Sequence, residues 1–127
     1  MIQGSCLCKA VTFTIANNPV KVSHCHCIMC QKGHGAAFAT YARFKRSDVT
    51  YLTGENKLIT YNSSEDVLRK FCGKCGSNIE WGCSERMPQW VAIAVASLDS
   101  PIDSTKMKNL HLESRAAWLH SLPDSSS

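Results

Sequence analysis

Long apolar stretches are absent from this sequence of 127 residues. No segment has the roughly 18 to 20 uninterrupted apolar residues that a membrane-crossing helix requires. The first ten residues also lack the basic start and apolar centre of a secretory signal, because polar residues and cysteines interrupt them. We therefore expect a soluble cytoplasmic protein without a membrane partner, with the nucleus as the alternative compartment.

Long amphipathic helical patterns are missing as well, and short alternating patterns stand in their place. Val11, Phe13 and Ile15 alternate with two threonines, which is the period of a strand with one buried face. A hydrophobic content of 44% is enough for a single core. We expect one mainly β domain over residues 1–120 and a polar, disordered tail over 121–127.

The remaining strands are expected between polar turns that contain glycine, asparagine and serine. Gly33 and Gly35 predict an irregular loop, and residues 47–49 predict a single helical turn. The short strands and hairpin turns imply antiparallel pairing throughout. The expected strands cover residues 20–22, 36–44, 50–52, 58–61, 67–71, 78–83 and 90–96, and a further ordered segment covers 110–119.

Cysteine, in contrast, is abundant, with eight residues. In an intracellular protein, cysteines at this density indicate metal or redox chemistry more often than disulfides. Cys25, Cys27 and Cys30 follow an expected strand, and a soft divalent metal is the commonest reason to gather three thiols so closely. Structural zinc sites close with four protein ligands, whereas catalytic sites keep three and leave one position to water or substrate. The three thiols therefore raise the question of an open site.

A second cysteine motif lies between glycines, as Cys72-Gly73-Lys74-Cys75-Gly76. This pattern is typical of a zinc knuckle. The simplest partition pairs Cys72 and Cys75 with Cys6 and Cys8 to close a four-sulfur structural site, which in small peptides supplies on the order of 10 kcal/mol of folding energy. A partition that places two cysteines from each cluster around shared metals stays open.

The remaining candidates flank these clusters. Cys83 is either a buried, incidental thiol or a fourth ligand that would close the second site. His24 and His26 would point away from Cys25 in an extended chain, so we favour hydrogen bonds to backbone or thiolate over ligation. An open three-thiolate zinc could bind an external thiol, lower its pKa and hold the thiolate for attack on a carbonyl carbon.

The excess of positive charge is small. The formal net charge is +4, and a zinc held by four thiolates contributes about −2 while one held by three contributes about −1, so a two-zinc form would carry about +1. Arg43, Lys45 and Arg46 form the one local basic cluster, for which a solvated face is the simpler interpretation. The charge therefore argues against a nucleic-acid partner.

Taken together, these motifs resemble a known family. Gly4-Ser5-Cys6-Leu7-Cys8, Cys25-His26-Cys27-Ile28-Met29-Cys30, Phe71-Cys72-Gly73-Lys74-Cys75-Gly76, Ser97-Leu98-Asp99 and Ser114-Arg115-Ala116-Ala117-Trp118 are similar to the motifs of the glutathione-dependent formaldehyde-activating enzyme family. All seven family cysteines are present in order, and the resemblance covers nearly the whole chain.

The resemblance implies an antiparallel Mss4-like β fold with short helical turns and two zinc ions per chain. It implies a structural zinc held by four cysteines and a catalytic zinc held by three, which act as ligands and not as nucleophiles. The implied reaction adds glutathione, as co-substrate, to formaldehyde to give S-hydroxymethylglutathione, which is carbon-sulfur lyase chemistry in the direction of bond formation. The structural ligands are Cys6, Cys8, Cys72 and Cys75, and the catalytic ligands are Cys25, Cys27 and Cys30.

The sequence departs from the family pattern at several positions. Lys9 stands where the family often has glycine, Ala117 replaces a usual proline, and Gln31-Lys32 replaces a pair of basic residues. Lys32 is therefore the remaining candidate to bind a glutathione carboxylate. Members such as centromere protein V resemble chromatin-associated proteins. The alternatives are thus a non-catalytic zinc module that binds a partner or a glutathione carrier, and a homo-oligomer stays open.

Overall fold

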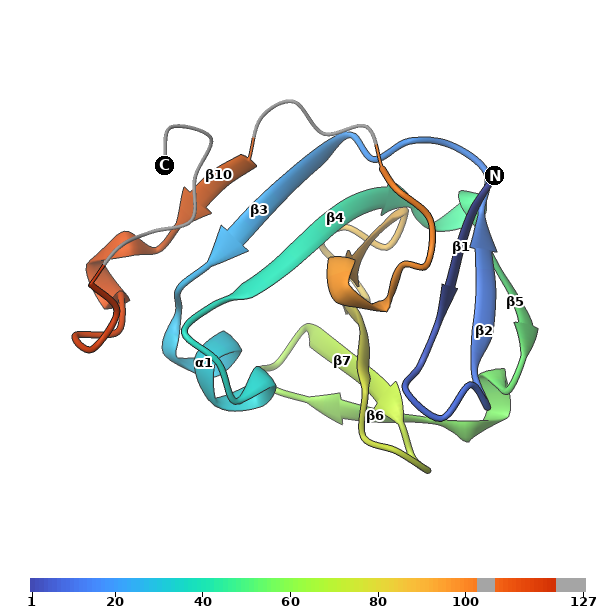
Figure 1. Ribbon diagram of the computed structural model, residues 1–127, viewed down its shortest axis with the longest axis horizontal. Helices are drawn as coiled ribbons and strands as arrows, with labels where there is room; N and C mark the ends of the chain where they lie inside the picture. The colour runs from blue at the N-terminus through green and yellow to red at the C-terminus, as the bar shows by residue number, and fades with distance from the viewer. Residues whose placement is uncertain (103–106, 121–127) are drawn as a thin grey trace.

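The strands of the protein form two sheets (Figure 1). The computed structural model describes residues 1–102 and 107–120, so the tail predicted at 121–127 lies outside the described residues. A three-stranded sheet has the order β1-β2-β5, with β1 (Ile2–Ser5), β2 (Thr12–Ile15) and β5 (Val49–Thr53). A seven-stranded sheet has the order β10-β3-β4-β9-β8-β7-β6. Its strands are β3 (Lys21–Cys25), β4 (Ala39–Lys45), β6 (Leu58–Asn62), β7 (Val67–Cys72), β8 (Asn78–Cys83), β9 (Trp90–Ala94) and β10 (Met107–Leu110). The prediction of a mainly β protein is confirmed.

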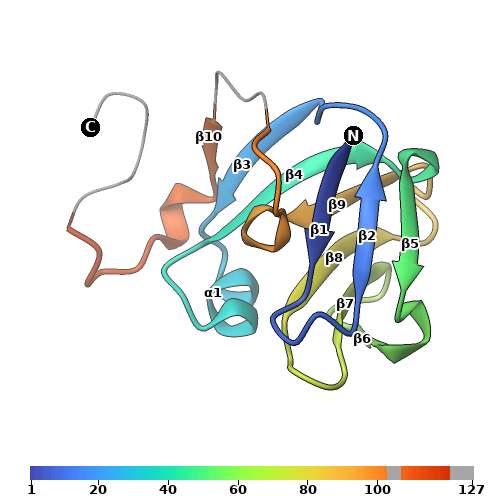
Figure 2. The ribbon, with the colours of Figure 1, turned by 45° about the vertical axis from the view of Figure 1, so that its right-hand side comes forward.

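The main hydrophobic core lies between the two sheets. Figure 2 shows β1 and β2 of the small sheet in front of β8 and β9 of the large one. Phe13 and Ile15 from β2 are buried in one cluster with Phe44, Ile79 and Ile93 from the large sheet. Because side chains alternate along a strand, the remaining side chains of the large sheet lie on its opposite face, outside this core.

One strand pair contradicts the prediction of antiparallel pairing throughout. β10 lies parallel to β3, with Met107 opposite Val22 and Leu110 opposite Cys25. The other strand pairs of the described residues are antiparallel. Short hairpin turns, on which the prediction was based, connect antiparallel neighbours only, and β10 joins β3 from far along the chain.

A short helix, α1 (Ile28–His34), was not predicted from the sequence. Its N-cap is Cys27, whose sulfur accepts a hydrogen bond from the Cys30 amide at 3.3 Å. Its C-cap is Gly35, at a φ of 60° that glycine adopts without strain. The loop predicted at Gly33 and Gly35 is confirmed only from Gly35 onward, because Gly33 lies inside the helix. The strand predicted from residue 36 begins at Ala39. Apolar periodicity is lacking in the helical segment because its cysteines take the capping and buried positions.

Strand β1 was also not predicted, and β9 is shorter than expected because a 3-10 turn, Val95–Ser97, follows it. The helical turn expected at 47–49 is confirmed as Arg46–Asp48. Two further 3-10 turns cover Glu55–Lys57 and Leu112–Ser114. In the described part of the chain, helices are too short or too polar to cross a bilayer.

Candidate functional site

Four cysteines meet where the small sheet approaches the end of β7. Cys6 and Cys8 lie in the loop after β1, and Cys72 and Cys75 lie at and after the end of β7. Their four sulfur atoms all lie within 4.8 Å of one another, with 3.6 Å between Cys6 and Cys8 and 3.9 Å between Cys8 and Cys72. The group can hold a metal ion.

Backbone amides donate hydrogen bonds to two sulfurs of this group. The amides of Val11 and Lys74 donate to the sulfurs of Cys6 and Cys72, at 3.3 and 3.4 Å. Hydrogen bonds with Ser77, first with its hydroxyl and then with its amide, lower the pKa of Cys75 to about 5. Thiolate is the form that binds metal, so these hydrogen bonds favour an ion at part of the group. The pKa of Cys8, in contrast, is lowered by the Ala10 amide but raised overall to about 11 by desolvation and the neighbouring thiols.

Three further cysteines meet at the junction of β3 and α1. Cys25 is the last residue of β3, Cys27 caps α1, and Cys30 is buried in the first helical turn. Their sulfurs also lie within 4.8 Å of one another, and among the described residues no other cysteine, histidine or carboxylate joins them. A hydrogen bond from Cys30 is the main cause that lowers the pKa of Cys25 to about 5. We call these three residues the cysteine trio; it can hold a metal ion with one position left over.

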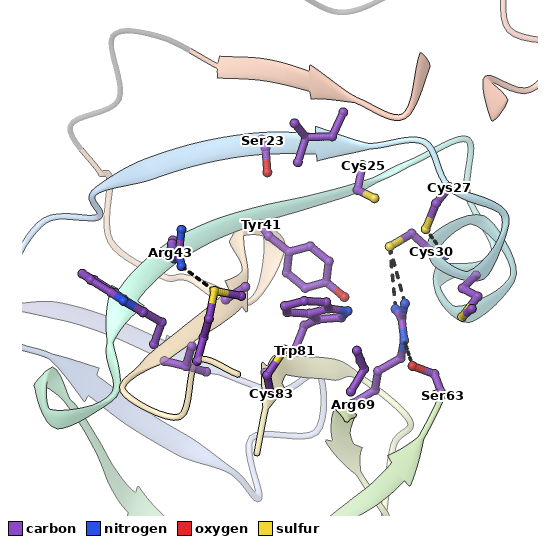
Figure 3. Close-up of a pocket in the computed structure, with 18 of the residues that line it drawn as sticks. Ser23, Cys25, Cys27, Cys30, Tyr41, Arg43, Ser63, Arg69, Trp81 and Cys83 are labelled. Atoms are coloured by element: carbon purple, nitrogen blue, oxygen red, sulfur yellow. Dashed lines mark hydrogen bonds between the residues drawn. The ribbon is translucent and has the colours of Figure 1, made fainter. Parts of the chain in front are cut away.

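Arg69 of β7 points at the trio (Figure 3). Both terminal nitrogens of its guanidinium lie 3.7 Å from the Cys30 sulfur, and its Nε donates to Ser63 Oγ at 2.8 Å. A cation held this close offsets the negative charge of clustered thiolates. Sequence reasoning missed Arg69, because a single arginine in a short strand carries no motif.

The trio opens into a cavity of about 420 Å³ on the face of the large sheet that turns away from the main core. Tyr41 and Trp81 lie in its middle, as Figure 3 shows. Lys21, Arg43 and Arg69 contribute positive charge, and among the residues that the structure describes no aspartate or glutamate lines the cavity. Burial raises the pKa of Tyr41, so its hydroxyl, which lies 2.8 Å from His34 Nε2, stays protonated. The cavity suits an anionic small molecule.

Cys83 and Lys32 lie apart from the trio. Cys83 is buried and lines the cavity, but its sulfur belongs to neither cysteine group and accepts a hydrogen bond from Arg86 at 3.3 Å. Lys32 is exposed on α1 and is not among the residues lining the cavity. Among the described residues, the lysine and arginines that line it come from β3, β4 and β7.

The histidines flanking Cys25 bind side chains, not backbone or thiolate as expected. His24 Nδ1 lies 2.8 Å from the Thr40 hydroxyl, and His26 Nε2 lies 2.8 Å from Asn109 Oδ1. Both histidines are buried, and both contact Phe38. Because Asn109 belongs to β10, the unexpected parallel strand holds His26, the residue between Cys25 and Cys27, in place.

The basic cluster expected at residues 43–46 is divided by the fold. Arg43 lines the cavity and stacks over the Trp90 ring at 4.9 Å. Arg46 pairs at 3.1 Å with Glu80, which is only 3% exposed. Two of the three cations are therefore engaged within the molecule.

Comparison with known proteins identifies similar chains. A family model described as glutathione-dependent formaldehyde-activating enzyme matches residues 1–114. An uncharacterized lyase of Schizosaccharomyces pombe is 31% identical over 78 residues, which are 61% of this chain and 54% of that protein. The chain therefore aligns with about half the length of this curated relative.

The fold has a solved counterpart. A crystal structure of a Rhodobacter sphaeroides protein aligns with a TM-score of 0.66 and 25% sequence identity, and the alignment covers 84% of this chain and 98% of that one.

Proposed function

The chain belongs to the glutathione-dependent formaldehyde-activating enzyme family, and from this premise we propose that it adds glutathione, or a related thiol, to formaldehyde or another small aldehyde. The observation that carries the proposal is the cysteine trio, which opens into a positively charged cavity with one ligand position left over. We further propose that residues 1–120 act as one domain. With all eight cysteines free, a reducing compartment, the cytoplasm or the nucleus, is part of the proposal.

Thiolate sulfur is a preferred zinc ligand, and each cysteine group brings its sulfurs within 4.8 Å of one another. With a Zn–S distance of about 2.3 Å, the sulfurs of a tetrahedral site lie about 3.8 Å apart. The separations of 3.6 and 3.9 Å in the four-cysteine group match this value. We assign a structural zinc to that group and a catalytic zinc to the trio. When bound at the trio, zinc supplies the Lewis acidity that keeps a thiol as thiolate near neutral pH.

The residues of the chain would position the two reactants. Cys25, Cys27 and Cys30 fix the metal, and Arg69 offsets the charge of the sulfurs. Tyr41 and Trp81 give the cavity an apolar middle that excludes water from the reacting atoms. The thiol sulfur forms a bond to the aldehyde carbon, the π electron pair of the C=O bond moves to oxygen, and the proton released from the thiol ends on that oxygen. The product is an S-hydroxymethyl thioether, and no oxidant is needed.

The rate of adduct formation tests this function. Glutathione and formaldehyde are mixed with wild type or with Cys27→Ser, and the adduct is followed by NMR against the uncatalysed addition. Wild type should accelerate formation, and Cys27→Ser should fall to the uncatalysed rate because the trio loses a ligand. The control is Thr60→Ser, a conservative change at an exposed residue of β6 outside the cavity and both cysteine groups, which should keep the wild-type rate.

Two results would remove the catalytic proposal. Equal rates for wild type and Cys27→Ser would show that the trio contributes nothing to the reaction. Binding of glutathione without acceleration would indicate a carrier in place of an enzyme.

A further inference from the structure

The floor of the cavity contains a row of residues that crosses five strands. The register places Lys21 opposite Arg43, Arg43 opposite Ala92, Ala92 opposite Trp81, and Trp81 opposite Arg69. Adjacent strands lie about 4.8 Å apart, so Arg43 and Arg69 are separated by about 14 Å along the sheet. The row therefore has cations at both ends and an apolar middle.

The two ends of this row lie at different distances from the trio. Arg69 contacts Cys30 directly, at 3.7 Å. Lys21 begins the strand that Cys25 ends, and four residues of strand span about 13 Å. Figure 3 shows Arg43 on the opposite side of Tyr41 and Trp81 from Cys30. We call Lys21 and Arg43 the remote cations.

The remote cations have no acidic partner within the described residues. The ion pairs found there involve Arg46, Arg86 and His111, and not Lys21 or Arg43. Arg43 is nevertheless held in place, because it stacks on Trp90 and donates to the Met87 sulfur at 3.0 Å. A guanidinium already fixed on an apolar wall loses little side-chain entropy when it binds a carboxylate.

We propose that the remote cations bind the carboxylate end of the thiol substrate while its sulfur lies at the cysteine trio. Lys21 and Arg43 are then specificity-determining residues, and the enzyme selects elongated thiols with a carboxylate several bonds from the sulfur. Short neutral thiols reach the trio but leave the remote cations without a partner. The assignment of the sulfur end rests on the proposed function.

Binding of S-methylglutathione, whose capped sulfur cannot react, tests the inference by isothermal titration calorimetry. The proteins are wild type, the double variant Lys21→Gln/Arg43→Gln and the control Lys45→Gln. Lys45 is an exposed cation of the same strand β4 that does not line the cavity. The double variant should bind roughly 10- to 100-fold more weakly, as expected for lost charged hydrogen bonds, whereas Lys45→Gln should match wild type.

The dimethyl ester of S-methylglutathione provides the complementary arm. With its carboxylates masked, it should bind wild type and the double variant equally weakly. Circular dichroism and zinc content verify that the variants fold. Equal affinity of wild type and the double variant for S-methylglutathione, or no binding to wild type at millimolar concentration, would overturn the inference.

The rate assay separates this inference from the proposed function. If adduct formation is not accelerated but S-methylglutathione binding depends on Lys21 and Arg43, the function fails and the carboxylate site stands. If adduct formation is accelerated equally by wild type and the double variant, with unchanged KM for glutathione, the carboxylate site fails and the function stands.

Discussion

At the scale of single residues, Arg69 is the clearest addition that the structure makes to the site. Its guanidinium lies between Ser63, which orients it, and Cys30, which it faces. Three thiolates around one divalent ion leave a net charge of about −1, and a guest thiolate adds another negative charge. A fixed cation beside the sulfurs would stabilise both a metal at the trio and a guest thiolate.

Arg69→Gln should therefore weaken metal binding at the trio. Loss of a charged hydrogen bond is worth about 1.5–3 kcal/mol, so we expect roughly a tenfold loss or more in affinity at the trio and no change at the four-cysteine group. Arg69→Lys, which keeps the charge, should recover part of the loss. Competition with a chromophoric zinc chelator measures both sites. Identical release of zinc from wild type and Arg69→Gln would contradict this role.

Lys9 illustrates why the family often carries glycine after the second cysteine. Its backbone has a φ of 65°, in the left-handed region that costs a residue with a Cβ about 1–2 kcal/mol. The Cys6 carbonyl accepts a hydrogen bond from the Lys9 amide at 3.1 Å, which closes the turn that brings Cys6 and Cys8 together. The departure from the family pattern is thus a local strain that the four-cysteine group tolerates.

At the scale of elements, the sequence predicted what depends on local alternation. Strand β8 was predicted with its observed bounds, because apolar and polar residues alternate between clear turns. Helix α1 and strand β10 could not be predicted in this way. Helix α1 depends on Cys27, which caps it, and on Cys30, which is buried in its first turn. The direction of β10 depends on its pairing with β3, which is distant in the sequence.

The loop between β8 and β9 depends on one carboxylate. Asp66 accepts hydrogen bonds from the Glu85 and Arg86 amides and from the Ser84 hydroxyl, at 2.8, 3.0 and 2.9 Å. Hydrogen bonds, first from the Arg86 amide and then from the Ser84 hydroxyl, hold the pKa of Asp66 well below its usual range. The same loop carries Met87, which supports Arg43 in the cavity.

Asp66→Asn should loosen this loop. At neutral pH the amides of Glu85 and Arg86 should exchange with solvent roughly tenfold faster than in wild type. The reason is that the asparagine side chain places an NH2 donor where one carboxylate oxygen of Asp66 accepts hydrogen bonds. The Ile93 amide in β9 is the internal control and should not change. Hydrogen exchange followed by NMR provides the measurement, and unchanged exchange at Glu85 and Arg86 would refute the role of the carboxylate.

The pH dependence of the stability that Asp66 contributes follows from the direction of its pKa shift. Because the pKa of Asp66 is lower in the folded protein than its unfolded value of about 3.9, its contribution to stability is complete above that value. It is lost as the pH falls below 4 toward the folded pKa. The difference in Tm between wild type and Asp66→Asn should thus be constant near neutral pH and shrink in acid.

At the scale of the whole molecule, two polar connections join the sheets. The four-cysteine group ties the loop after β1 to the end of β7, more than sixty residues away in sequence. Buried Glu80 of β8 accepts hydrogen bonds from Tyr51 of β5 and, at 3.1 Å, from Arg46. Both connections flank the main core, so a metal in the first would stabilise the global fold.

The candidate site was only partly predictable from the sequence, because part of it depends on contacts between distant segments. The spacing of the cysteines led to two groups, and the structure gathers the sulfurs in two such groups. Each cysteine motif is local in the sequence, which is why the motifs could be recognised there. The cavity depends on the register of five strands, so Lys21, Arg43 and Arg69 could not be recognised as neighbours. Lys32, the predicted contact for glutathione, lies outside the cavity and stays a prediction without structural support.

The measurement that tests the central claim most directly is the absorption spectrum of the cobalt-substituted protein during titration with glutathione. If the trio holds a metal with an open position, thiolate-to-cobalt absorption should increase and saturate at one glutathione per chain. The increase should be absent in Cys30→Ser, which lacks one ligand of the trio. A wild-type protein that binds two cobalt ions but shows no spectral change with glutathione would contradict the account.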